Sequence, residues 1–172
     1  MNIKETQFND LQLLDELVFK TLKIILKNIH PESESREYFA HRFQLDHYQI
    51  LFRVAKITPT KIGQFVSIWK RNEQEITAPF DVKDDLDFLM IATKTPIHFG
   101  VFIFPKKIMH EYQILSDETR DGKRGIRIYP TWDEPTSKQA KKTQLWQTQY
   151  FLNLSDINRI DLDLVKKILT LK

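Results

Sequence analysis

Two short apolar runs near the middle of the chain constrain its fold more than any other feature. Asp87–Thr93 and Phe99–Phe104 are almost continuously apolar, and Pro105 ends the second run. Short runs without polar–apolar alternation are typical of strands that are covered on both faces. The sequence therefore predicts a central β-sheet with other layers packed against both of its sides.

The remaining elements are expected to surround this centre. Three more strands are predicted where β-formers cluster between turn residues, at Tyr48–Ile57, Gly63–Lys70 and Gly125–Tyr129. Helices are predicted at Asp10–Asn28, Lys106–Tyr112, Lys138–Phe151 and Leu162–Leu169, and a polar connection at Glu32–Glu37. Ser137 or Thr136 is expected to cap the third helix, and Asp161 the last. In a chain of 172 residues without a visible repeat or linker, this order predicts a single α/β domain (1–172) with a mixed sheet of about five strands flanked by helices.

Composition excludes several classes of function. The chain has no cysteine, which rules out thiol nucleophiles, cysteine zinc sites, CxxC redox centres and disulfides. The first residues carry charges throughout, and no run of about 20 apolar residues exists, so neither a signal peptide nor a membrane span is expected. We therefore expect a folded protein of the cytoplasm.

The net charge of +3 is small but unevenly distributed. Residues 53–71 carry five Lys or Arg and no acid, and residues 120–142 carry seven basic and three acidic residues. Between them, residues 72–119 carry nine acidic and only four basic residues. Two basic islands thus flank an acidic segment, and phosphate is the most abundant polyanion that such a surface meets in the cytosol.

Several basic residues stand where their side chains are free to meet phosphate. Lys123 and Arg124 occupy a turn between two glycines, and Arg53 adds charge to the first central strand. Three lysines of the helix predicted from Lys138 are spaced i, i+3, i+4 and share one face. The candidates for nucleic-acid contact are Lys56, Lys61, Lys70, Lys106, Lys123, Arg124, Arg127, Lys138, Lys141 and Lys142, with Trp69, Tyr129 and Trp132 beside them to stack on unpaired bases. A solvated helix face and ordinary core packing are the competing interpretations for the lysines and the aromatics.

The acidic segment, together with Lys106, suggests a second function, which is metal-dependent cleavage of nucleic acid. Metal-dependent nucleases commonly place one Asp at the start of a strand and Glu-x-Lys at the end of its neighbour, where two carboxylates hold Mg²⁺ against the scissile phosphate. Asp87 and Lys106 stand about where this arrangement requires them, but Phe104 occupies the position of the second carboxylate. The predicted catalytic site is therefore degenerate, and Mg²⁺ is implied only if cleavage occurs.

Other enzyme classes find no support in the sequence. The five histidines form no HExxH motif and no i, i+4 pair. Phosphate-binding glycine motifs and a nucleophile elbow are absent. No cofactor is expected.

Several long segments resemble the MepB family, which is named for a protein encoded beside a bacterial multidrug-efflux pump. The segments are FRVAKITPTKIGQFVSIWKR (Phe52–Arg71), PFD (Pro79–Asp81), FGVFIFPKKI (Phe99–Ile108), GKRGIRIYPTWD (Gly122–Asp133) and SKQAKKTQLWQTQYF (Ser137–Phe151). The resemblance extends over about residues 48–151 in the same order. It implies a small bacterial cytoplasmic protein whose fold resembles restriction-type endonucleases, with nucleic-acid binding proposed and the catalytic acids incomplete.

Three hypotheses follow. The first is a nuclease-like domain that binds DNA or RNA, mostly independently of sequence, without cutting it. The second is an active Mg²⁺-dependent nuclease that uses Asp87 and Lys106. The third is a protein-interaction or regulatory module associated with the efflux operon, whose basic faces meet an acidic partner.

Overall fold

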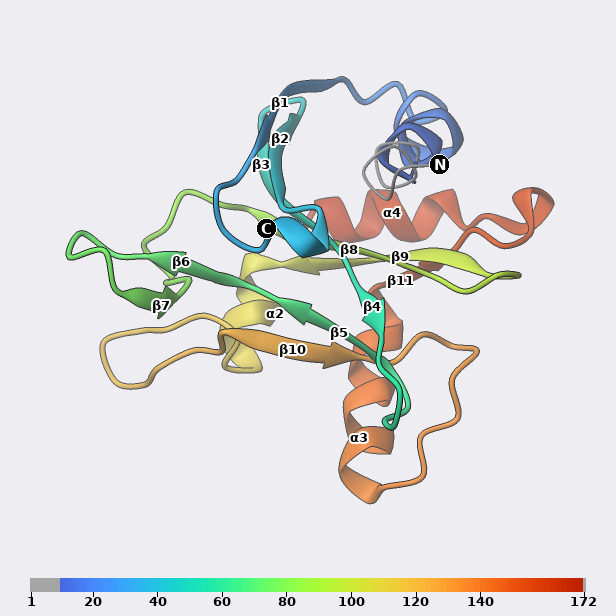
Figure 1. Ribbon diagram of the computed structural model, residues 1–172. Helices are drawn as coiled ribbons and strands as arrows, with labels where there is room; N and C mark the ends of the chain where they lie inside the picture. The colour runs from blue at the N-terminus through green and yellow to red at the C-terminus, as the bar shows by residue number, and fades with distance from the viewer. Residues whose placement is uncertain (1–9, 172) are drawn as a thin grey trace.

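A six-stranded mixed sheet forms the centre of the computed structural model, which describes residues 10–171 (Figure 1). Its strand order is β1-β2-β3-β8-β9-β11. The strands are β1 (Leu26–Pro31), β2 (His41–Leu45), β3 (Tyr48–Val54), β8 (Phe88–Lys94), β9 (Phe99–Pro105) and β11 (Phe151–Asn153). β3 and β8 are parallel, and the other neighbouring pairs are antiparallel. The two apolar runs of the sequence are therefore strands inside the sheet, as predicted, and they pair with each other.

Two smaller sheets lie beside the central one. In the three-stranded sheet, β5 (Gln64–Ser67) pairs with β10 (Gly125–Ile128) on one side and β4 (Lys56–Ile57) on the other. The two-stranded sheet joins β6 (Trp69–Arg71) to β7 (Thr77–Pro79). Both sheets are antiparallel, and the backbone of β5 continues almost directly into β6.

Short helices complete the fold. Residues 10–14 are α-helical and continue into a π-helical turn, η1 (Asp15–Phe19). The others are the 3₁₀ turns η2 (Arg36–Tyr38), η3 (Thr148–Tyr150) and η4 (Ile157–Arg159) and the α-helices α2 (Lys106–Glu111), α3 (Lys138–Gln147) and α4 (Leu162–Leu169). The predicted caps are confirmed, because Ser137 accepts a hydrogen bond from the N–H of Ala140 and Asp161 accepts one from the N–H of Leu164. Within residues 10–171, no helix is long and apolar enough to cross a membrane.

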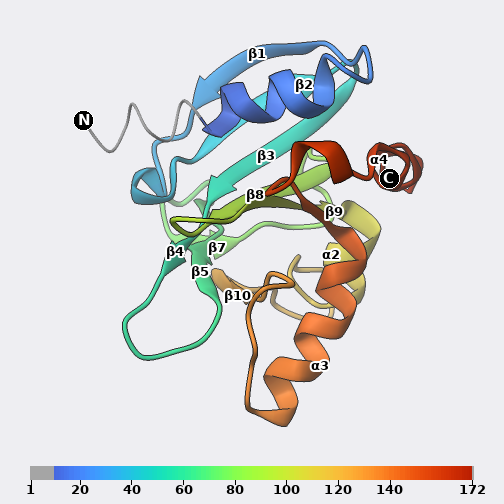
Figure 2. The same cartoon turned by 90° about the vertical axis from the view of Figure 1, so that its right-hand side faces the viewer.

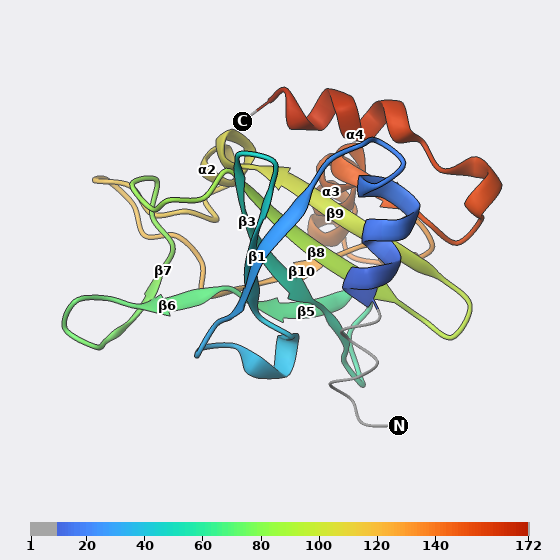
Figure 3. The ribbon, with the colours of Figure 1, turned by 90° about the horizontal axis from the view of Figure 1, so that it is seen from above.

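The central sheet separates two hydrophobic cores, because side chains alternate along each strand. On β3 and β8, Phe52 and Met90 point into core 1, which the N-terminal helix and α4 cover. Leu51 and Leu89 point into core 2, which contains residues of β5, β10 and α2. Figures 2 and 3 show the N-terminal helix and α4 on one side of the sheet, with α3 and the small sheets on the other. Coverage of both faces is confirmed.

The N-terminal helix predicted at Asp10–Asn28 is wrong in its second half. The helix ends at Phe19, and the chain reverses through Lys23, whose φ is 59°. Ile25 and Asp46 then exchange hydrogen bonds, and Leu26–Pro31 pairs with β2. The apolar residues that suggested one long helix therefore pack against core 1 from two different elements. The residues Leu26–Pro31 form a strand because their backbone pairs with β2, although their apolar side chains are spaced as in a helix.

The sheet has six strands where about five were predicted. Two of the predicted strands, Gly63–Lys70 and Gly125–Tyr129, belong to the small sheets, and the central sheet gains β1, β2 and β11, which were predicted as helix or connections. The predicted strand Tyr48–Ile57 divides into β3 and β4, which belong to different sheets. Short strands at sheet edges carry little periodic signal because they contain only a few residues. The α/β class is confirmed, with a six-stranded mixed sheet and two small sheets.

Candidate functional site

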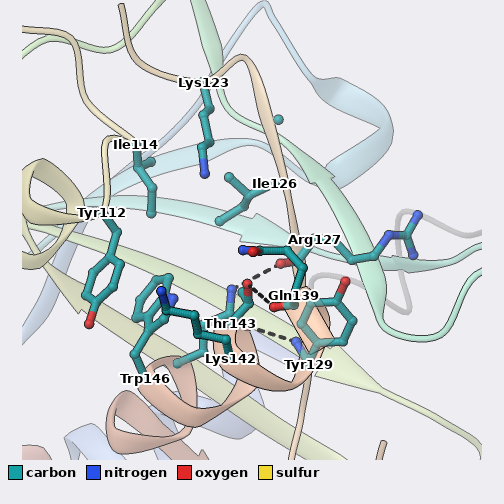
Figure 4. Close-up of a pocket in the computed structure, with 12 residues that line it drawn as sticks. Tyr112, Ile114, Lys123, Ile126, Arg127, Tyr129, Gln139, Lys142, Thr143 and Trp146 are labelled. Atoms are coloured by element: carbon teal, nitrogen blue, oxygen red, sulfur yellow. Dashed lines mark hydrogen bonds between the residues drawn. The ribbon is translucent and has the colours of Figure 1, made fainter. Parts of the chain in front are cut away.

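A pocket of about 430 Å³ lies between β10 and α3, on the core 2 side of the central sheet (Figure 4). The loops before and after β10, the end of α2 and one face of α3 form its walls. The lining residues are Tyr112, Ile114, Lys123, Gly125, Ile126, Arg127, Tyr129, Gln139, Lys142, Thr143, Trp146 and Gln147. None of them is acidic, so the lining carries only positive charge.

A buried glutamine holds the two main walls together. The side chain of Gln147, 1% exposed, accepts a hydrogen bond from the N–H of Tyr129 at 2.9 Å. It also donates to the carbonyl of Arg127 at 3.0 Å. These bonds satisfy both ends of the amide and attach the last turn of α3 to the outgoing end of β10. The separation of the two walls is therefore set by a specific contact rather than by loop packing.

Lys123 and Lys142 enter the pocket from different walls. Lys123 belongs to the loop before β10, and Lys142 to α3 (Figure 4). Both are exposed, and among residues 10–171 neither ammonium group has an ion-pair or hydrogen-bond partner. The loop that carries Lys123 is closely packed, since a Cβ at Gly122 would approach the amide nitrogen of Ser116 to 2.6 Å. Two unpaired cations therefore face the same cavity, one of them from a constrained backbone.

An aromatic pair forms one end of the pocket. The rings of Tyr112 and Trp146 are nearly parallel, with an interplanar angle of 8° and centroids 3.9 Å apart. Trp146 also packs on the buried ring of Phe104, at 5.3 Å between centroids. Figure 4 shows the two rings side by side beneath Ile114. A rigid, half-exposed aromatic surface thus adjoins the two lysines.

The guanidinium of Arg127 forms hydrogen bonds within the protein. This group points away from Lys123 and donates to the hydroxyl of Thr58 at 3.0 Å and to the carbonyl of Gly63 at 3.1 Å (Figure 4). It therefore holds the loop between β4 and β5. A neighbouring depression of about 290 Å³, which includes Lys61, also uses Arg127 in its lining. Arg127 thus lines both hollows, whereas Lys61 lines only the neighbouring depression.

The three lysines of α3 separate. Lys142 lines the pocket, whereas Lys141 lines a depression that also contains Asp133 and Glu134. Lys138 is exposed in the first turn and lines neither hollow. The spacing that placed all three on one face of the helix is correct as a local relation, but that face extends beyond the edge of the pocket.

Three other residues predicted to contact nucleic acid do not line this pocket. Arg124 donates to the carbonyl of Thr77 in β7, and the ammonium of Lys56 lies 5.1 Å from the ring centre of Tyr38. Trp132 stacks on His98 with an interplanar angle of 10°. The structure therefore brings Lys123 and Lys142 together and leaves these three residues outside the pocket.

Arg53 does not contribute to the surface charge of the first basic island, residues 53–71. Its side chain is 0% exposed, and it pairs with Glu32 and donates to the carbonyl of Ser67. Desolvation lowers the pKa of Arg53, and the charge of Glu32 opposes this effect. A buried, paired guanidinium contributes to the core and not to a binding surface.

The side chains of Asp87, Lys106 and Asp84 form contacts within the protein. Asp87 precedes β8, and its carboxylate accepts the N–H of Gln49 at 2.8 Å. Lys106 donates to the carbonyl of Asp84 at 2.7 Å, and Lys70 pairs with the carboxylate of Asp84 at 2.6 Å. Among residues 10–171, no group of three or more His, Asp or Glu side chains is placed to hold a metal ion.

The sequence reading missed the aromatic pair. Trp146 follows Gln139 by seven residues and Lys142 by four, so helical spacing alone places these three side chains on one face of α3. Tyr112 carries no comparable signal, because it lies more than 30 residues away and meets Trp146 only through the tertiary fold. Half of the pair was therefore recognisable from the sequence.

Comparison with known proteins agrees with this architecture. The sequence model of the MepB-like family matches residues 32–153. The chain belongs to the MepB-like family. A solved structure described as the crystal structure of MepB is similar to this MepB-like chain, with 34% identity and a TM-score of 0.74, over 76% of this chain and 88% of that one. A search of curated proteins found no match. The resemblance inferred from about residues 48–151 is confirmed, and the family match begins earlier, within the loop before β2.

Proposed function

We propose that this MepB-like protein binds nucleic acid, mostly independently of sequence, through the surface around the pocket between β10 and α3. The observation that carries the proposal is the convergence of Lys123 and Lys142 on a cavity without acidic lining. When lysines without internal partners contact phosphates, the counterions condensed on the nucleic acid are released. This release supplies most of the affinity that does not depend on sequence. The Tyr112–Trp146 pair adds a surface on which bases can stack.

Binding without cleavage fits the surroundings of Phe104, Asp87 and Lys106. Phe104 points into core 2 and is 0% exposed, so the position where a second carboxylate was sought belongs to the hydrophobic interior. The carboxylate of Asp87 is already bonded to a backbone N–H, and Lys106 to a backbone carbonyl. We therefore propose a binding protein rather than a nuclease. The likeness to restriction-type endonucleases stays a prediction.

The test compares two variants that lose the same charge from opposite sides of the central sheet. Lys123→Ala/Lys142→Ala removes the pocket cations, and Lys166→Ala/Lys167→Ala removes two exposed lysines of α4 on the core 1 side. Affinity for labelled DNA and RNA is measured by anisotropy at several salt concentrations. Each phosphate contact contributes about 0.7–0.9 to the slope of log K against log salt. The pocket variant should therefore lose about 1.5 from this slope, and the α4 variant almost nothing.

The outcomes separate three explanations. Weak binding that both variants lower equally would show that net charge, and not this surface, attracts nucleic acid. A wild-type protein that binds neither DNA nor RNA would overturn the proposed function. Turnover of a labelled strand with Mg²⁺ that disappears in Asp87→Ala would restore the nuclease hypothesis.

A further inference from the structure

We infer that the pocket between β10 and α3 receives one unpaired nucleotide, with its base against the Tyr112–Trp146 pair and its phosphate between Lys123 and Lys142. This inference rests on the proposed function and narrows its ligand to single-stranded nucleic acid or a free nucleotide. Both sources present the same chemistry, which is a planar base joined through a sugar to an anion.

The size of the pocket favours a single nucleotide. Its volume of about 430 Å³ falls within the range of about 300–1,000 Å³ that is common for small-molecule sites. Bases in a duplex are stacked on both faces and paired at their edges, so a duplex cannot place a base here without breaking those contacts. An unpaired strand avoids this cost. The pocket therefore discriminates by the accessibility of bases rather than by phosphate charge.

The aromatic surface is held in place before any ligand binds. Trp146 is fixed by its helix and by Phe104 beneath it. Tyr112 follows α2, and its N–H donates to the carbonyl of Ile108 at 3.0 Å. A pre-ordered aromatic surface loses little conformational entropy when a base stacks on it. Stacking is tolerant of base identity, in agreement with sequence-independent binding.

Of the polar side chains that line the pocket, Gln147 has a structural role and Gln139 is available to contact a ligand. Both ends of the Gln147 amide are already bonded to the backbone around β10. Gln139 lies one turn before Lys142 and Thr143, is exposed, and has no side-chain hydrogen bond among residues 10–171. Its amide can both donate and accept, as the edge of an unpaired base requires. Gln139 is therefore the group that contacts the base edge.

The experiment measures the affinity of the full chain for a single-stranded oligonucleotide, the matched duplex and a nucleoside monophosphate. Trp146→Leu keeps apolar volume but removes the aromatic surface, and Trp69→Leu in β6 is the matched control outside the pocket. Loss of one base–aromatic stack should lower affinity for the single strand about ten-fold. Affinity for the duplex should stay unchanged. Tryptophan fluorescence should be quenched by the single strand in wild type and in Trp69→Leu, but not in Trp146→Leu.

A second variant keeps the test decisive if Trp146→Leu fails to fold. Gln139→Ala changes only an exposed side chain and should weaken binding of the single strand without affecting the duplex. Duplex binding as tight as single-strand binding, with both weakened equally by Gln139→Ala, would overturn this inference and leave the proposed function standing. Absence of binding to every nucleic acid would overturn both. Comparable affinity for the monophosphate and the strand would support the inference and identify a free nucleotide as a sufficient ligand.

Discussion

Arg53 shows how a single residue can connect distant parts of this fold. It lies on β3 beneath β5, with no exposed surface, and its partner Glu32 belongs to the loop between β1 and β2. Glu32 also pairs with Arg42 at 3.0 Å, so one carboxylate serves two guanidinium groups. Because Arg53 cannot reach water, its charge depends on Glu32 for compensation.

Glu32→Gln should therefore destabilise the protein strongly. Removing one partner of a buried ion pair costs about 3–5 kcal/mol, since the other charge is left buried and uncompensated. The measurement is the free energy of unfolding in urea. Glu37→Gln, an exposed carboxylate of the same loop, is the control and should change stability by less than about 0.5 kcal/mol. The double variant Glu32→Gln/Arg53→Met should be more stable than Glu32→Gln alone, and a less stable double variant would contradict this account.

Asp117, in the loop that leads to Lys123, should make the stability of the protein depend on pH. Its carboxylate accepts hydrogen bonds from the hydroxyl and N–H of Thr119 and from the N–H of Arg120, and it pairs with His110 at 2.8 Å. These contacts, led by the hydroxyl of Thr119, hold the pKa of Asp117 well below its ordinary value of 3.8. A lowered pKa means that the ionised form stabilises the folded state above the ordinary value, and that this contribution is lost as pH falls further.

The stability difference between wild type and Asp117→Asn should therefore depend on pH. It should be largest near about pH 5 and should shrink steadily toward about pH 2, because over that range the unfolded chain binds a proton at Asp117 while the folded carboxylate stays largely ionised. Chemical unfolding at several pH values measures the difference. A difference that stays constant down to low pH would show that the carboxylate does not carry the loop contacts in its ionised form.

At the scale of secondary-structure elements, α3 is attached to β10 mainly through its last turn. Most of its residues are polar, and Gln147 is the only residue of α3 that is fully buried. The attachment therefore depends on the two backbone hydrogen bonds of Gln147, on those that Gln144 donates to the carbonyls of Pro130 and Asp133, and on the aromatic contacts of Trp146. The predicted helix Lys138–Phe151 is correct to Gln147, after which the chain tightens into η3 and then joins the sheet as β11.

Gln147→Leu should loosen this attachment. The substitution leaves the partly buried N–H of Tyr129 and carbonyl of Arg127 without their partner, at about 1 kcal/mol for each group, the low end of the cost for a buried unsatisfied group. The stability loss is measured by thermal or urea unfolding, and hydrogen exchange should speed up in α3 before the central sheet. Gln149→Leu, which changes an exposed residue of η3, should leave both measurements close to wild type. Equal exchange rates in α3 for the two variants would contradict the structural role of Gln147.

At the scale of the whole molecule, the central sheet couples the two cores. The strands β3, β8 and β9 each contribute alternate side chains to core 1 and core 2, so neither core can form without the same backbone. Trp132 and Trp146 pack against core 2, whereas α4 and the N-terminal helix pack against core 1. Loss of one core should therefore remove the support of the other.

Unfolding should consequently be a single transition. Tryptophan fluorescence, which reports mainly on the core 2 side, and far-ultraviolet circular dichroism, which reports on the whole backbone, should give the same midpoint in urea. Trp69→Leu serves as a control for the contribution of the tryptophan in β6. Two separate midpoints would show that the layers on the two sides of the sheet unfold independently.

Much of this architecture was predictable because the signals are local. Asp87–Thr93 and Phe99–Phe104 could be recognised as inner strands from their unbroken apolar character, and Asp161 and Ser137 as helix caps from their position before helical residues. Burial on both faces of a strand and satisfaction of helix N–H groups involve residues that are close in sequence. Lys123 was recognisable as a projecting cation for the same reason, because its turn is bounded by glycines.

The sequence by itself determined the α/β class, the two inner strands at Asp87–Thr93 and Phe99–Phe104 and the presence of two basic segments, since each depends on the order of neighbouring residues. Only the tertiary structure decided which charges are available. It buried Arg53, paired Lys70 with Asp84, turned Arg127 toward its own loop, and left Lys123 and Lys142 facing one cavity beside Tyr112 and Trp146. The physical reason is that desolvation and pairing depend on distances in space, and residues far apart in the chain acquire those distances only when the sheet and its covering layers assemble.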